Sequence, residues 1–147
     1  MKKIVATPTL SLGAYADGDA VGGKLEFEDA RTPYENSGDI LSLTIKDNDS
    51  EKADFFLVLF DRDFTETADN AEFDPSDADL LNCIGVMELD DYIEFKNNSI
   101  GIYQEDHQHI HFVLQEGGTS LFGQLVADGS TPTYTAVNDI RVELIIK

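Results

Sequence analysis

Three histidines at alternate positions are the residues best placed to hold a metal ion. His107, His109 and His111 are separated by Gln108 and Ile110, and alternate side chains of a β-strand project from one face. Neutral imidazoles on one face can bind Zn²⁺ or Ni²⁺. Apolar residues occupy the opposite face, so the histidines also fit the solvent-facing half of an amphipathic strand, where they could respond to pH. We expect no bound metal and keep the three histidines as the candidates.

The acidic segments are candidates for calcium binding. The segment 47–51 is similar to the start of an EF-hand loop, but Lys52 stands where the tight-turn glycine belongs, and this excludes the motif. The segments 61–63 and 69–74 are rich in carboxylates and could form an irregular oxygen-ligand site, or simply solvated acidic loops. We expect no cofactor at either of them.

The sequence offers little for nucleophilic catalysis. Cys83 is the single cysteine, and a lone cysteine among apolar neighbours is typical of a buried thiol. No GxSxG or HExxH motif occurs, and no glycine-rich phosphate loop. We therefore expect a protein that is not an enzyme.

Length and charge narrow the function classes further. The chain has 147 residues, enough for one domain with a sizeable core. Its 29 Asp and Glu outnumber ten Lys and Arg, which gives a formal charge of −19. Such a balance argues against binding nucleic acid or anionic lipid, since both need basic surfaces. No stretch approaches the roughly 18 apolar residues of a membrane span, so we expect neither nucleic acid nor a membrane as partner.

Short strands must position these residues. Side chains alternate between apolar and polar in several segments, and the run 55–60 is apolar throughout, which favours a strand covered on both faces. The segment 75–81 is the one convincing helix, with Asp74 as N-cap and Pro75 at the first helical position. The expected strands are 24–28, 40–46, 55–60, 84–89, 92–95, 99–104, 107–115, 121–127 and 139–147.

This pattern of short strands and turns indicates an antiparallel sandwich or barrel. We predict an all-β fold, a jelly-roll-like antiparallel β-sandwich with one short helix, forming a single domain over residues 1–147. The segment 7–9 contains Pro8, which cannot donate to a β-ladder. We therefore expect residues 1–23 to form an extended arm and loop.

Three groups of segments together resemble small structural proteins of tailed bacteriophages, of the kind encoded beside major capsid genes. The groups are 13–25; 57–61 with 69–71 and 76–80; and 121–126 with 132–135 and 139–144. The resemblance covers nearly the whole chain through turn and strand signatures. It implies a capsid decoration or cement protein with a β-sandwich fold, made in the host cytoplasm and carried on the exterior of the virion.

A decoration protein acts through contacts with its neighbours. The resemblance implies the major capsid protein as partner, and symmetry makes a homo-oligomer expected. The exposed arm and loop supply our candidate contact residues: Thr7, Pro8, Thr9, Tyr15, Asp17 and Asp19. Two alternatives remain open, a structural protein of the tail, baseplate or connector, and a carbohydrate- or calcium-binding β-sandwich module.

Overall fold

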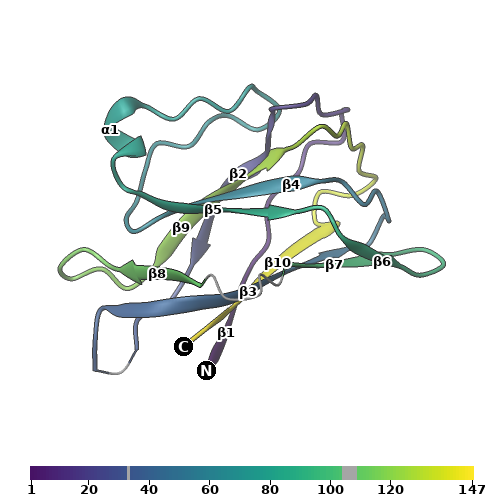
Figure 1. Cartoon of the computed structure of the whole chain (residues 1–147). Helices are drawn as coiled ribbons and strands as arrows, with labels where there is room; N and C mark the ends of the chain where they lie inside the picture. The colour runs from purple at the N-terminus through teal and green to yellow at the C-terminus, as the bar shows by residue number, and fades with distance from the viewer. Residues whose placement is uncertain (33, 104–108) are drawn as a thin grey trace.

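The computed structural model describes residues 1–32, 34–103 and 109–147 and shows a β-sandwich with one short helix (Figure 1). A six-stranded sheet has the order β1-β10-β3-β7-β6, with β8 also paired to β3, and a four-stranded sheet has the order β2-β9-β4-β5. The elements are β1 (Lys2–Ala6), β2 (Ala20–Phe27), β3 (Ser37–Asp47), β4 (Phe55–Phe60), α1 (Asp77–Leu80), β5 (Cys83–Leu89), β6 (Tyr92–Glu94), β7 (Ser99–Tyr103), β8 (Ile110–Val113), β9 (Leu121–Ala127) and β10 (Ile140–Ile146).

The strand pairs are nested within one another along the chain. β1 pairs with β10, β2 with β9, β3 with β7 and β8, and β4 with β5, all antiparallel. The chain thus resembles one long hairpin in which β1 to β4 run out and their partners run back. Successive pairs along this hairpin alternate between the two sheets. This is the jelly-roll arrangement, and it confirms the predicted fold class.

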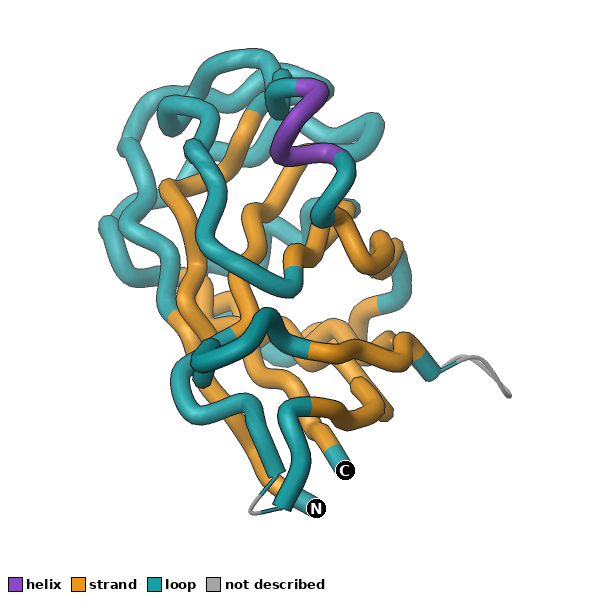
Figure 2. Tube along the Cα trace, turned by 90° about the vertical axis from the view of Figure 1, so that its left-hand side faces the viewer, coloured by secondary structure: helices purple, strands orange, loops and turns teal. Residues whose placement is uncertain are grey.

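The core lies between the two sheets, where alternate side chains from both meet. β4 is buried on both faces, as its apolar run predicts. Leu57 and Leu59 face the core between the sheets, whereas Val58 and Phe60 belong to a second cluster with Phe64. That cluster forms because the segment 61–82 folds over the outward side of the four-stranded sheet. The segment, with α1, lies at the end of the molecule opposite both chain ends (Figures 1 and 2).

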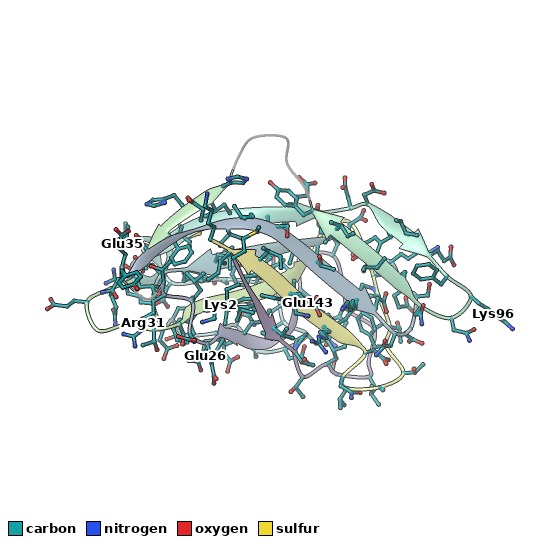
Figure 3. All side chains as sticks on the ribbon, turned by 90° about the horizontal axis from the view of Figure 1, so that it is seen from below. Lys2, Glu26, Arg31, Glu35, Lys96 and Glu143 are labelled. Atoms are coloured by element: carbon teal, nitrogen blue, oxygen red, sulfur yellow. The ribbon has the colours of Figure 1, made fainter. Side chains whose placement is uncertain are left out.

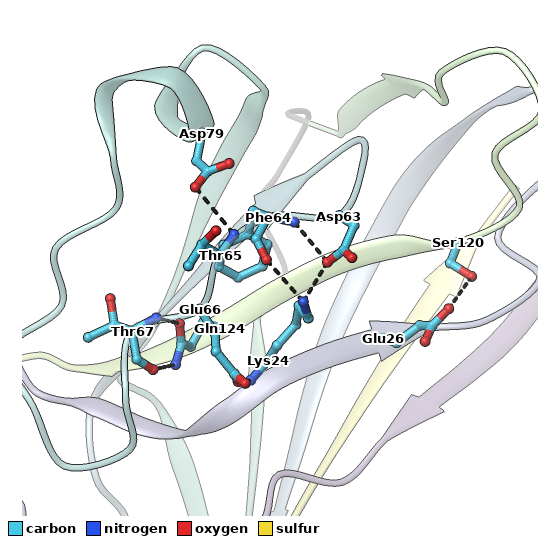
Figure 4. Close-up of polar contacts among 10 residues, drawn as sticks. All are labelled: Lys24, Glu26, Asp63, Phe64, Thr65, Glu66, Thr67, Asp79, Ser120 and Gln124. Carbon is cyan, nitrogen blue, oxygen red and sulfur yellow. Dashed lines mark hydrogen bonds and ion pairs between the residues drawn. The ribbon is translucent and has the colours of Figure 1, made fainter.

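A buried glutamine fixes this covering segment to the sheet. Gln124 of β9 has no exposed surface. Its amide nitrogen donates to the carbonyls of Gly22 (3.1 Å) and Thr67 (2.7 Å), and its amide oxygen accepts from the Thr67 N–H (3.1 Å). Nearby, Lys24 of β2 pairs with Asp63 and donates to the Phe64 carbonyl (Figure 4). These contacts satisfy backbone groups that the loop would otherwise bury without partners.

The helix begins later than the sequence predicts. Its N-cap is Ser76, whose hydroxyl accepts from the Asp79 N–H at 3.1 Å, and Asp74 is not the cap. Asp74 and Ser76 lie on either side of Pro75, and both residue types cap helices well. With Ser76 as the N-cap, acidic residues fall in the first turn, where they favour the helix dipole.

The expectation of an extended N-terminal arm is wrong. Residues 2–6 form β1, paired along its length with β10, and residues 20–23 already belong to β2. Between them the chain packs onto the sandwich, because Leu10 and Tyr15 are buried in the core. Pro8 is also buried, and it leaves no room for a side chain at Gly22, whose φ of +76° favours glycine.

Candidate docking surface

The outward face of the six-stranded sheet carries an unusual set of side chains for so acidic a protein. The strand registers place Arg141, Lys46, Ile100 and Ile93 in one cross-strand row. They place Val5, Glu143, Thr44 and Ile102 in the next row, followed by Lys3, Ile145 and Ser42. On the same side of β3 and β8 lie Asp39, His111 and Val113. We call these fourteen residues the outward face.

Its carboxylates are engaged within the face. The Glu143 side chain is 8 % exposed, and its Oε1 lies 2.9 Å from both Lys46 Nζ and Arg141 Nε. Burial raises the pKa of Glu143, but the Lys46 hydrogen bond and the surrounding positive charges outweigh it and leave the pKa below its ordinary value. Figure 3 shows Glu143 near the middle of the sheet. Asp39 lies 3.0 Å from His111 Nδ1.

The outward face therefore differs in charge from the rest of the molecule. It holds three Lys or Arg and two carboxylates among the described residues, in a chain with 29 acids and ten Lys and Arg. Six of its residues are aliphatic, and Ile93 and Val113 are more than half exposed. The segment 61–82 covers much of the corresponding side of the four-stranded sheet, over Val58, Phe60 and Val126, so the six-stranded sheet presents the broader open face.

The predicted contact residues do not form this surface. Tyr15 is wrong as a contact, because it is 1 % exposed and its hydroxyl is held 2.7 Å from an Asp69 oxygen. Pro8 is wrong for the same reason of burial. Asp17 accepts from the Gly129 N–H and Asp19 from the Ala16 N–H, so both stabilise loops. Thr7 and Thr9 are exposed on either side of Pro8.

The structure describes two of the three candidate histidines, His109 and His111. Both side chains are exposed, as an amphipathic strand predicts, whereas Phe112 of β8 is buried in the core. His107 lies outside the described residues. In the part of the chain that the structure describes, no group of three His, Cys, Asp or Glu is arranged to hold a metal ion.

The carboxylates of the acidic segments bind backbone N–H groups or pair with cations, as Asp61 does with Arg62 and Asp63 with Lys24. Asp47 accepts from the N–H groups of Asp49 and Lys52, each at 2.9 Å, and so closes the turn after β3. Burial raises the pKa of Asp47 despite these donors. Asp69 accepts from the Gly22 N–H at 2.7 Å.

The thiol of Cys83 is partly buried against the second apolar cluster.

Sequence reasoning missed the outward face because its members come from six strands. Alternation places Lys46 and Arg141 on the solvent side of their strands, but not beside each other. A signal was present for two of the cations: Lys46 and Arg141 lie on strands that the sequence predicts, 40–46 and 139–147.

Comparisons with known proteins identify no family for this chain: no family model, curated protein or solved structure matches it. Within the described residues, no helix is long and apolar enough to cross a membrane.

Proposed function

We propose that this protein is a non-enzymatic structural protein of a bacteriophage virion that decorates the capsid exterior and docks through the outward face. The observation that carries the proposal is the contrast between this face and the remaining surface. A strongly acidic exterior keeps particles soluble and apart, while one face low in carboxylates, with aliphatic side chains, can be buried against a neighbour.

The face fits a partner of defined chemistry. Lys3, Lys46 and Arg141 favour a partner surface that supplies carboxylates, and the aliphatic residues favour apolar contacts beside them. A shell protein that offers both across a subunit junction would be stabilised by the bound copy, because the copy binds the assembled lattice more tightly than a free subunit. Resemblance to phage virion proteins supplies the proposed identity of that partner, the major capsid protein.

The test is binding to purified capsids that lack this protein, measured by co-sedimentation and then by cryo-electron microscopy. Ile93→Glu introduces a carboxylate into the outward face at an exposed position. Leu81→Glu introduces a carboxylate outside the outward face, at an 87 % exposed position beside α1, and serves as the control. We expect the first variant to lose binding and the second to bind as the native protein does.

Equal binding by both variants, or density for this chain away from the capsid exterior, contradicts the proposal. Copy number separates the alternative of a tail or connector protein. A decoration protein is present in numbers comparable with the major capsid protein, and a connector in far fewer copies. Mass spectrometry of intact virions measures this ratio.

A further inference from the structure

The two open sides of the sandwich differ in charge. On one side β1 lies along β2, and on the other β5 lies along β7 and β8. β1 and β2 are edge strands of their sheets, and β5 is the other edge of the four-stranded sheet. In the six-stranded sheet β6 follows β7 as the last strand. We call the two open sides the β1–β2 side and the β5–β7 side, and each has a depression between the sheets.

The β1–β2 side gathers half of the positively charged residues of the chain. Two adjoining depressions, of about 580 and 590 Å³, share Lys2 and Asp29. Their charged lining residues are Lys2, Lys3, Lys24, Arg31 and Lys147 against Glu26, Glu28 and Asp29, so the side chains sum to +2 in a chain of −19. Figure 3 shows Lys2, Glu26 and Arg31 in this region.

Three of these cations are open to a partner. Lys2 pairs with Asp29 and Lys24 with Asp63. Lys3, Arg31 and Lys147 are exposed and form no ion pair with the described residues.

The β5–β7 side carries the opposite charge. Its depression, of about 390 Å³, is lined by Glu88, Asp90 and Asp91 and by no Lys or Arg among the described residues. The three carboxylates are exposed, and no described cation pairs with them. Two exposed aliphatic side chains lie beside them, Val86 at 50 % and Ile102 at 38 %.

Further carboxylates surround this depression. Asp54 and Asp128 flank β4 and β9 where these strands meet, and act on Glu88 through their charge. Partial desolvation by neighbouring groups, and then these like charges, raise the pKa of Glu88. The β5–β7 side thus concentrates negative charge that its own residues do not neutralise.

From this complementarity we infer that copies of the chain associate head to tail, the β1–β2 side of one copy against the β5–β7 side of the next. The occupant is a second copy because the molecule presents both halves of the contact on opposite edges of the same sandwich. Contacts of this kind are heterologous and form rings when the rotation closes. The inference goes beyond the proposed function, and its geometry agrees with it: copies joined at their edges share only Lys3, Val5 and Ile102 with the outward face and leave the rest of that face free to dock.

The contact must form against the mutual repulsion of two strongly acidic molecules. At about 0.15 M salt the Debye length is roughly 8 Å. Repulsion between charges farther apart than this is largely screened, whereas ion pairs at the contact are screened much less. We therefore expect weak association that grows with protein concentration and that a capsid surface would increase by holding copies close together.

Sedimentation equilibrium of the full chain in 0.15 M salt, up to about 1 mM protein, tests the inference. The variant Arg31→Glu with Lys147→Glu reverses the β1–β2 side, and Glu88→Lys with Asp90→Lys reverses the β5–β7 side. None of these four residues belongs to the outward face, so capsid binding is measured separately. We expect the native protein to associate and each variant alone to be monomeric. An equal mixture of the two variants should associate at a 1:1 ratio, because each restores the charge that the other lacks.

A control separates local contact from net charge. Glu72→Lys with Asp74→Lys, at exposed positions of the segment 61–82, changes the total charge as the β5–β7 variant does, and we expect it to associate at least as well as the native chain. Circular dichroism confirms that each variant is folded. A native protein that stays monomeric to the highest concentration overturns the inference. So does a β5–β7 variant that associates normally, which would indicate a symmetric contact through one side.

Discussion

Replacing Gln124 by methionine tests whether the covering segment 61–82 is fixed by one buried amide. Methionine conserves the length of the side chain, so the substitution removes hydrogen bonds and leaves little cavity. Gln124 makes three hydrogen bonds, two to Thr67 and one to Gly22. At a net value of about 1 kcal/mol each, their loss lowers the free energy of unfolding by about 3 kcal/mol.

That loss corresponds to a fall in Tm of roughly 6–12 °C, since 1 kcal/mol shifts Tm by about 2–4 °C in a chain of this size. Differential scanning calorimetry measures the shift, and hydrogen exchange at the Thr67 amide reports whether the segment opens locally. Gln115→Met, at an exposed position, is the matched control and should change Tm by little. A Tm for the Gln124 variant within the range of that control would refute the role assigned to the amide.

Three further predictions rest on single contacts. Tyr134 is buried and its hydroxyl has no hydrogen-bond partner among the described residues, whereas the Tyr92 hydroxyl donates to a backbone carbonyl at 2.6 Å. In urea unfolding, Tyr134→Phe should be neutral or stabilising and Tyr92→Phe should cost about 1 kcal/mol; the reverse order would contradict the assignment. Gly22 and Gly129 both have positive φ, but only at Gly22 would a Cβ meet another side chain, at 2.5 Å. Gly22→Ala should therefore lower Tm clearly more than Gly129→Ala does. Equal losses of Tm in the two variants would count against the packing explanation. Burial and neighbouring carboxylates raise the pKa of Asp54. The folded state therefore binds the proton of this carboxyl more tightly than the unfolded state does, and the protein loses stability as pH rises from about 4 through the folded pKa. Asp54→Asn should stabilise the protein at pH 7 and have little effect at pH 3; an equal effect at both pH values would show that charge is not the cause.

The strands could be predicted from local patterns. The apolar run of β4 and the segment of β9 agree with the structure residue for residue, because a strand buried on one or both faces is recorded in its own side chains. β1 was missed because Pro8, which cannot donate to a β-ladder, favoured an extended arm. The place of β1 in the sheet depends on Ile146 and its neighbours at the other end of the sequence. Local periodicity holds no information on such distant pairing.

The candidate surface could be predicted even less. Tyr15 lies in a loop rich in Gly, Ala and Asp, which is typical of an exposed segment, yet Tyr134 meets its ring edge-on at 6.3 Å in the core. The neutral character of the outward face follows from Glu143 lying between Lys46 and Arg141. Arg141 is two residues from Glu143, but Lys46 comes from β3, so only the register of the sheet brings the three together.

The nested pairing of strands also sets the order in which this protein can be completed during synthesis. Of the described strands, β1 is translated first and β10 last, and β10 is the only described ladder partner of β1. β1 must therefore wait, unpaired, until β10 has been translated, whereas β6 with β7 and β4 with β5 can pair early because their partners are close in the sequence. Such high contact order makes folding slow, and it gives the nascent chain a long interval in which a chaperone would protect the open edge.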